Sequence, residues 1–237
     1  MSDRRLICAL DLPTADEARA LTERLGEAVE FYKVGLQLFA TDGMALARDL
    51  KADGKQVFLD WKLHDIGATV EKAAAALAGS GCDLLTVHAR PQVMAAARKG
   101  ADGSGLKILG VTVLTSLTDA DLSADDHSLS AADLVALRVR QALDAGVDGV
   151  VSSPHEAAQV RALADAAGHS DFLIVTPGVR PEGADKGDQQ RVATPRAALE
   201  AGASHLVVAR PVVAADNPLR AASAIVESVG GVARRPA

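Results

Sequence analysis

The chain has 237 residues, of which 49% are hydrophobic but only 3% aromatic. Its formal net charge of −6 argues against a broad nucleic-acid-binding surface and favours a soluble protein, so attraction for an anionic ligand would have to be local. No apolar run reaches the roughly 18 residues of a membrane span, and residues 1–5 are polar rather than signal-like. The length suits a single α/β barrel, which typically uses about 250 residues.

Apolar runs alternate with helical patterns along the chain. The predicted strands are Leu6–Leu12, Phe31–Leu36, Gln56–Leu63, Leu84–Ala89, Ile108–Leu114, Gly149–Ser152, Phe172–Thr176 and His205–Ala209. The predicted helices are Thr14–Leu25, Thr41–Asp53, Thr69–Leu77, Gln92–Lys99, Ser130–Ala145, Pro154–Ala167, Pro195–Ala201 and Pro218–Val229. Thr14, with Glu17 three residues later, has the spacing of a capping box.

Strands and helices therefore alternate strictly, eight of each. Nearly continuous apolar strands bounded by helices indicate a parallel sheet, and eight such units close most simply into a (β/α)8 TIM barrel. We predict one domain over residues 1–237, with a flexible tail at 230–237. A doubly wound open sheet is the alternative fold.

The two cysteines, Cys8 and Cys82, lie in apolar contexts. They form neither a CxxC motif nor a disulfide framework, so we interpret them as core residues of a cytoplasmic protein.

The third strand carries the motif D-x-K-x-x-D at Asp60, Lys62 and Asp65. Residues two apart on a strand face the same side, so Asp60 and Lys62 should point together while Trp61 points away. Charges in such a place are costly to desolvate unless they are paired, which favours a functional role. A structural ion pair that closes a barrel layer is the alternative.

Other polar residues fall at strand ends, where barrels carry their chemistry. They are Asp11, Lys33, His88, Thr115 and Ser116. Loops after the seventh and eighth strands often bind phosphate, and here they contain Gly178, Arg180 and Arg210. A phosphorylated ligand is favoured over arginines that only form surface salt bridges. The remaining histidines show no metal-ligand spacing, and neither a Walker loop nor a GxGxxG follows a strand.

The sequence resembles the orotidine 5′-monophosphate (OMP) decarboxylase family nearly from end to end. The matching segments are Ala9–Asp11, Lys33–Gly35, Phe58–Ile66 with Thr69, Val87–Ala89, Val113–Ser116, Thr176–Arg180, Asp188–Gln189, Arg191–Val192, Thr194–Pro195 and Val208–Pro211. The D-x-K-x-x-D motif alone is shared with sugar-phosphate enzymes of the superfamily. Its combination with the segments around Arg180 and Gln189 is specific to the decarboxylases.

The resemblance implies decarboxylation of OMP to UMP, the last step of pyrimidine synthesis, without metal or organic cofactor. It implies a catalytic network of Lys33, Asp60, Lys62 and Asp65, in which Lys62 delivers a proton to C6 of the pyrimidine. It also implies a homodimer, because Asp65 and Thr69 would reach into the partner's site. The implied ligand contacts are Asp11 and Lys33 to the ribose, Thr115 or Ser116 to the pyrimidine, and Gly178, Arg180, Gln189, Ala209 and Arg210 around the phosphate.

One departure and three alternatives accompany this resemblance. The family usually has glycine where this chain has Ala209, and the added methyl would be tolerated if φ is negative. The nearest alternative function is a metal-dependent sugar-phosphate decarboxylase or synthase of the same superfamily. A Schiff-base aldolase using Lys33 or Lys62 is a second, although paired carboxylates disfavour the neutral amine that it needs. A catalytically silent nucleotide-binding barrel is the third.

Overall fold

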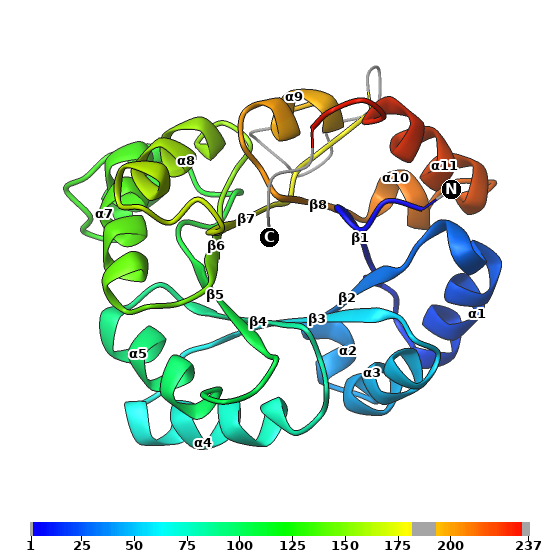
Figure 1. The fold of residues 1–237 in the computed structure, drawn as a ribbon, viewed down its shortest axis with the longest axis horizontal. Coiled ribbons are helices and arrows are strands. Elements are labelled where there is room, and N and C mark those ends of the chain that lie inside the picture. The colour runs from blue at the N-terminus through cyan, green and yellow to red at the C-terminus, as the bar shows by residue number, and fades with distance from the viewer. Residues whose placement is uncertain (1, 182–192, 234–237) are drawn as a thin grey trace.

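The structure, a computed structural model, describes residues 2–181 and 193–233. Within these residues, eight parallel strands pair in chain order and β8 pairs back with β1, which closes the barrel (Figure 1). The strands are β1 Leu6–Ala9, β2 Phe31–Gly35, β3 Gln56–Leu63, β4 Leu84–His88, β5 Lys107–Val111, β6 Gly149–Val151, β7 Leu173–Thr176 and β8 His205–Val208. The predicted (β/α)8 barrel is confirmed, and the open-sheet alternative is wrong.

Helices surround the barrel on its outside (Figure 1). Those that the sequence predicted are α1 Ala15–Leu25, α3 Gly43–Ala52, α4 Gly67–Ala78, α5 Pro91–Gly100, α7 Ala131–Asp144, α8 Ala157–Ala166, α9 Pro195–Glu200 and α11 Pro218–Ser228. Their starts follow local chemistry, since the hydroxyl oxygens of Thr14, Ser130 and Thr194 each accept a hydrogen bond from a first-turn amide.

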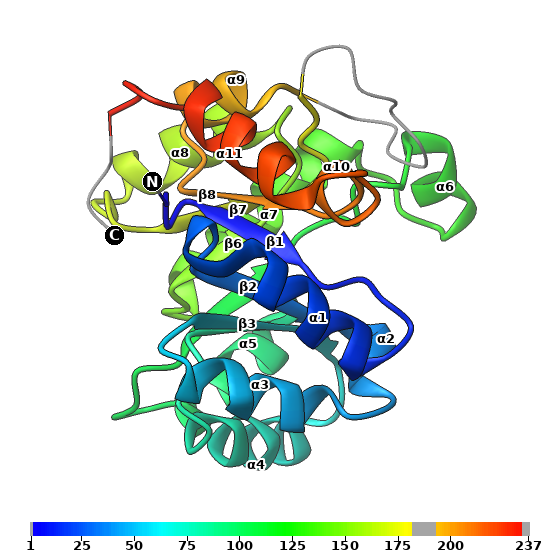
Figure 2. The ribbon, with the colours of Figure 1, turned by 90° about the vertical axis from the view of Figure 1, so that its right-hand side faces the viewer.

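Four short segments were not predicted. They are α2 Leu36–Phe39, α6 Asp119–Ala124, α10 Arg210–Val213 and the 3₁₀ turn η1 Gly26–Ala28. Each is too short to display a helical period, so the sequence pattern could not reveal it. Figure 2 shows α2, α6 and α10 on the side toward which the strands point. They add to the rim that carries the polar residues.

Side chains alternate between two hydrophobic clusters, one inside the barrel and one between the barrel and its helices. On β1, Ile7 faces inward and Cys8 outward; on β2, Phe31 faces inward and Tyr32 outward. The inner cluster is apolar and holds residues such as Phe31 and Phe58. Two residues further along the same strands come Lys33 and Asp60, so the period of two places charges directly above an apolar plug.

The carboxyl ends of several strands, and part of the C-terminal tail, differ from the prediction. The strands β1, β2 and β5 end three, one and three residues before their predicted ends, because the chain leaves the ladder there to form the rim. Of the predicted tail, residues 234–237 lie outside the described residues, while the Gly230 carbonyl accepts from Arg196 and the Val232 carbonyl from Arg5.

Two further features concern the cysteines and the length of the helices. Cys8 and Cys82 are buried and unbridged, as predicted for core residues. Among residues 2–181 and 193–233, no helix is long and apolar enough to cross a membrane.

Candidate active site

A cavity of about 460 Å³ opens at the carboxyl ends of the strands. It is lined by Ala9, Asp11, Lys33, Phe58, Asp60, Lys62, Val111, Val113, Leu114, Thr115, Val151, Pro177, Gly178, Arg180, Val207, Ala209, Arg210 and Val213. The predicted site residues that line this cavity are Asp11, Lys33, Asp60, Lys62, Thr115, Gly178, Arg180, Ala209 and Arg210. The other apolar residues that line the cavity were not predicted, although inward strand positions could have indicated Ala9, Phe58 and Val207.

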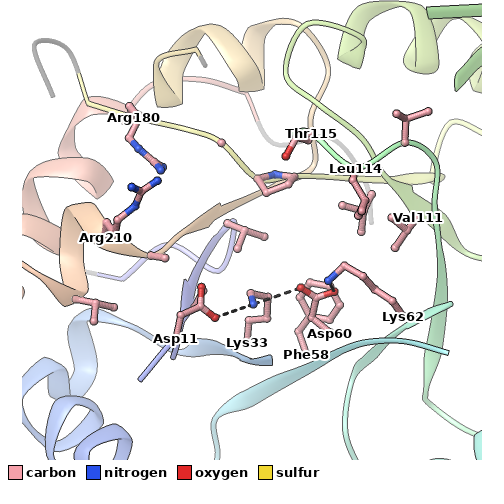
Figure 3. A pocket seen from close by; sticks show the side chains of 18 residues that line it. Asp11, Lys33, Phe58, Asp60, Lys62, Val111, Leu114, Thr115, Arg180 and Arg210 are labelled. Atoms are coloured by element: carbon pink, nitrogen blue, oxygen red, sulfur yellow. Dashed lines mark hydrogen bonds and ion pairs between the residues drawn. The ribbon is translucent and has the colours of Figure 1, made fainter. Parts of the chain in front are cut away.

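One side of the cavity is a charged row made of Asp11, Lys33, Asp60 and Lys62 (Figure 3). Lys33 Nζ lies 3.1 Å from Asp11 Oδ1 and 3.3 Å from Asp60 Oδ2. Lys62 Nζ lies 2.8 Å from Asp60 Oδ1. Acidic and basic groups therefore alternate, and Asp60 bridges the two ammonium groups.

The pKa values of Lys33 and Asp60 both shift toward the ionised forms. Burial opposes charge on Lys33, yet the carboxylates of Asp60 and Asp11 outweigh it and raise the pKa of Lys33. Burial likewise opposes charge on Asp60, but Lys33 and Lys62, with a hydrogen bond from Thr86, hold the pKa of Asp60 below its usual value. Each buried charge is thus sustained by its neighbours.

Lys62 occupies an irregular part of β3. The register pairs Leu59 with Leu85 and then Leu63 with Val87, so β3 has two more residues than β4 between these pairs. Lys62 itself has φ 51°, the left-handed conformation that residues with a side chain rarely adopt. Asp60 and Lys62 face the cavity and Trp61 packs outward against Phe39, as predicted, but a bulge rather than a regular strand brings this about.

Gly35 gives the charged row its space on the β2 side. A Cβ atom at this position would lie 2.9 Å from Lys33 Nζ and 3.0 Å from Asp11 Oδ1. The first contact is shorter than real Cβ atoms make and the second is tight, so any larger residue here would force the ends of the Lys33 and Asp11 side chains to shift.

Across the cavity, Arg180 and Arg210 both line its wall, and their guanidinium groups point toward one another (Figure 3). Arg180 is buried and donates to the Val179 carbonyl at 2.9 Å, whereas Arg210 is exposed. Gly178, with φ 76°, makes the left-handed turn that precedes Arg180. Two adjacent cations beside a glycine turn form a suitable site for a phosphate dianion.

The third side is formed by the segment after β5. Thr115 is buried and lines the cavity beside Leu114, while Ser116 is exposed and does not line it. Thr115 is therefore the better placed of the two residues that the sequence left open.

Comparisons with known proteins agree along nearly the whole chain. A family model described as the orotidine 5′-phosphate decarboxylase / HUMPS family matches residues 4–225. The orotidine 5′-phosphate decarboxylase of Caulobacter vibrioides is 64% identical over 98% of this chain and 99% of its own length. That of Cereibacter sphaeroides is 55% identical over 95% of this chain and 97% of its own.

A solved structure gives the same result. The crystal structure of orotidine 5′-phosphate decarboxylase from Lactobacillus acidophilus matches with a TM-score of 0.83 at 36% identity, covering 97% of this chain and 100% of the other. The chain belongs to the orotidine 5′-phosphate decarboxylase / HUMPS family. The resemblance predicted from its motifs is thereby confirmed.

Two residues that the family resemblance implied, Asp65 and Thr69, do not line the cavity in this single chain. Asp65 and Thr69 are exposed around the start of α4, and the Asp65 carboxylate accepts a hydrogen bond from the Ile66 amide at 2.6 Å. Gln189 lies outside the described residues.

Ala209 stands where the family usually has glycine. Ala209 has φ −113°, which an alanine can adopt, and it lines the cavity just before Arg210. The condition stated for tolerating the extra methyl, a negative φ, is met.

The histidines lie apart from this decarboxylase-family cavity. His88 does not line it, and its ring centroid lies 5.1 Å from that of His64. His205, the first residue of β8, is partly buried and packs edge-on against Phe31, and the loss of solvent around its ring lowers its pKa to about 4. In the part of the chain that the structure describes, no three His, Cys, Asp or Glu side chains are grouped as a metal site.

The polar residue that the sequence analysis missed is Thr86, in the middle of β4. It is fully buried and donates a hydrogen bond to Asp60 Oδ1 at 3.0 Å. A hydroxyl in the middle of an otherwise apolar strand was the available signal.

Proposed function

We propose that this chain is a carboxy-lyase that converts OMP to UMP, the last step of pyrimidine nucleotide synthesis. The observation that carries the proposal is a cavity with the Lys33–Asp60–Lys62 charges on one side and Arg180 with Arg210 on the other. Family membership and the 64% identical decarboxylase support the same activity.

The chemistry explains why an ammonium group is needed. Loss of CO2 from C6 of the pyrimidine leaves an electron pair perpendicular to the ring π system, so resonance cannot disperse it. A fixed cation next to C6 stabilises the developing negative charge electrostatically. Lys62 supplies this cation and then donates a proton to C6, acting as general acid.

Asp60 keeps Lys62 in place for this step. Its carboxylate is held by Lys33 at 3.3 Å and holds Lys62 at 2.8 Å, so the proton donor is oriented before substrate binds. Such preorganisation lowers the barrier because no charges need to rearrange during reaction.

The rest of the nucleotide is bound by the remaining walls. Arg180 and Arg210 bind the phosphate together with Gly178, Ala209 and Gln189. Phosphate binding far from C6 provides remote binding energy that favours the reactive geometry. Asp11 accepts hydrogen bonds from ribose hydroxyls and Lys33 donates to them. Thr115, with Ser116 as the alternative, contacts the pyrimidine.

A second copy of the chain completes the site. Asp65 and Thr69 are exposed in this chain, and beside them Ile66 is 73% exposed. Large apolar side chains that follow the neighbouring β2, Leu36 and Phe39, are also exposed, which favours burial against another molecule. A homodimer in which Asp65 and Thr69 enter the partner's cavity accounts for both features.

Mixing two inactive variants tests this arrangement. Lys62→Ala and Asp65→Ala should each be inactive alone, but one site of each mixed dimer has both native residues. Random mixing therefore restores about one quarter of wild-type activity. If subunits exchange and no activity returns, the shared site is wrong.

The barrel and the cysteines bear on domain organisation and location. We infer that residues 1–237 form one barrel domain, because the closed barrel takes in strands from Leu6 to Val208. We infer a cytoplasmic location from the two buried, unbridged cysteines.

One assay decides the activity. OMP is added to the purified enzyme with excess chelator, and loss of orotate absorbance is followed while UMP is identified as product. We expect full activity with the chelator. If OMP is not consumed, the proposal fails; if a sugar phosphate is turned over instead, and only with added divalent metal, the sugar-phosphate alternative is correct.

A further inference from the structure

Thr86 links the two strands that carry the centre of the charged row. Its side chain is fully buried on β4 and does not line the cavity. The hydroxyl donates to Asp60 Oδ1 at 3.0 Å and accepts from the Lys62 backbone amide at 3.0 Å. One hydroxyl group thus uses both its proton and a lone pair on residues of the charged row.

The bulge in β3 explains why this hydroxyl is needed. Between Leu59 and Leu63 the regular ladder with β4 is interrupted. A partly buried backbone amide in such a gap must find another acceptor, because leaving it unpaired costs about 1–3 kcal/mol. Thr86 Oγ1 takes the place of a ladder carbonyl for the Lys62 amide.

The same contact holds the unusual conformation of Lys62. Its φ of 51° costs on the order of 1 kcal/mol or more for a residue with a Cβ, so surrounding contacts must stabilise it. The backbone conformation directs the Lys62 side chain toward Asp60, and its Nζ lies 2.8 Å from Asp60 Oδ1. Asp60 Oδ1 accepts from both Thr86 and Lys62, so a closed ring of contacts joins the three residues.

We propose that Thr86 is a positioning residue for the decarboxylation, its hydroxyl fixing the Lys62 backbone and the Asp60 carboxylate so that the ammonium group meets C6. This rests on the proposed function. Thr86 touches no substrate, since it does not line the cavity. Its loss should therefore reduce kcat rather than nucleotide binding, which the arginines on the far side supply.

The first variants isolate the hydroxyl. Thr86→Ser and Thr86→Ala both lose the methyl group, but only the serine keeps the hydrogen bonds. We expect Thr86→Ala to lower kcat by about tenfold to a hundredfold, since small misplacements of catalytic groups have effects of that size. Thr86→Ser should recover most of it, while KM for OMP and Kd for UMP stay within about threefold of wild type in both.

A nearly isosteric pair supplies the matched control. Thr86→Val removes the hydroxyl at nearly constant volume. Thr112→Val does the same to another buried threonine, whose hydroxyl donates to the Val151 carbonyl at 2.9 Å and which does not line the cavity. Thr86→Val should lose kcat like Thr86→Ala, and Thr112→Val should remain within about twofold of wild type.

The outcomes are separable. Wild type must first consume OMP; if it does not, the proposed function fails before Thr86 is tested. With an active wild type, equal kcat values for Thr86→Ser and Thr86→Ala overturn the positioning role. Equal losses in Thr86→Val and Thr112→Val also overturn it. Should Thr86→Val not fold, the serine and alanine pair decides.

Discussion

The charged row and the two arginines occupy opposite sides of one cavity but are built differently. Lys33, Asp60 and Lys62 are strand residues whose charges are paired within the row. Arg180 and Arg210 belong to the connections after β7 and at the start of α10. The chemistry is thus carried by residues of the barrel strands, and binding of the phosphate by residues of the connections that follow them.

The difference shows in what each side needs from its surroundings. The charged row depends on a bulge, a glycine at position 35 and the Thr86 hydroxyl, all fixed by the barrel. Arg210, by contrast, is exposed at the start of α10. Substitutions in the charged row should therefore affect mainly kcat, and substitutions of the arginines mainly KM.

The largest expected effect is that of Lys62→Ala. We expect kcat to fall by about 10⁴-fold or more, because both general acid and electrostatic stabilisation are lost. Binding of UMP, measured by calorimetry, should be retained because the arginines remain. Decarboxylation of OMP at a rate near that of wild type would show that Lys62 has another role.

A surface pair offers the control for this variant. Lys99 Nζ lies 2.8 Å from Glu71 Oε1, the same separation as between Lys62 and Asp60, but the Lys99 side chain is 72% exposed. Exposed pairs contribute little. Lys99→Ala should leave kcat and KM unchanged.

Arg210→Ala tests the other side of the cavity. Loss of a charge-assisted contact to phosphate should raise KM for OMP by about a hundredfold. The cleanest check uses orotidine, which has no phosphate, because its much slower turnover should be the same in wild type and variant. An equal loss on both substrates would mean that Arg210 does not bind phosphate.

Gly35→Ala should produce an intermediate effect on the charged row. The new Cβ would displace the end of the Lys33 side chain, which is flexible, so stability should change little. The loss of the Lys33–Asp11 contact should lower kcat/KM by about tenfold while Tm stays within about 3 °C. An unchanged kcat/KM would show that Lys33 functions without its partner Asp11.

Much of the fold and of the cavity could be predicted from sequence, for physical reasons. Buried parallel strands have continuous apolar runs, and caps such as Thr14 mark helix starts. The alternation of strands and helices, and with it the barrel, could therefore be predicted. Charges at the ends of such runs, Lys33 and Asp60 for example, indicated the rim on which the cavity lies.

The remainder depends on contacts between segments that are distant in sequence. The bulge at Lys62 arises from its register with β4, and no local pattern encodes that register. The Thr86 hydroxyl reaches Asp60 only because β4 pairs with β3. Likewise, the choice of Thr115 over Ser116 follows from which side chain the turn after β5 directs into the cavity.

The smallest expected effect is on how the free energy of unfolding depends on pH through Asp60. The pKa of Asp60 in the folded chain is lower than the ordinary carboxyl value of about 3.9. Between these two values the unfolded chain binds the extra proton, so stability rises with pH there. The contribution of Asp60 is present above about pH 3.9 and is lost as pH falls through the folded pKa.

The variant Asp60→Asn lacks this titration. Its Tm should therefore fall less than that of wild type between pH 6 and pH 3, as calorimetry can measure. Asp102→Asn, at an exposed carboxylate paired with Arg98 at 3.5 Å, serves as control and should fall with wild type. A drop in Asp60→Asn equal to that of wild type would mean that the ion pairs with Lys33 and Lys62 do not stabilise the folded chain, and that the charged row is held together by the barrel alone.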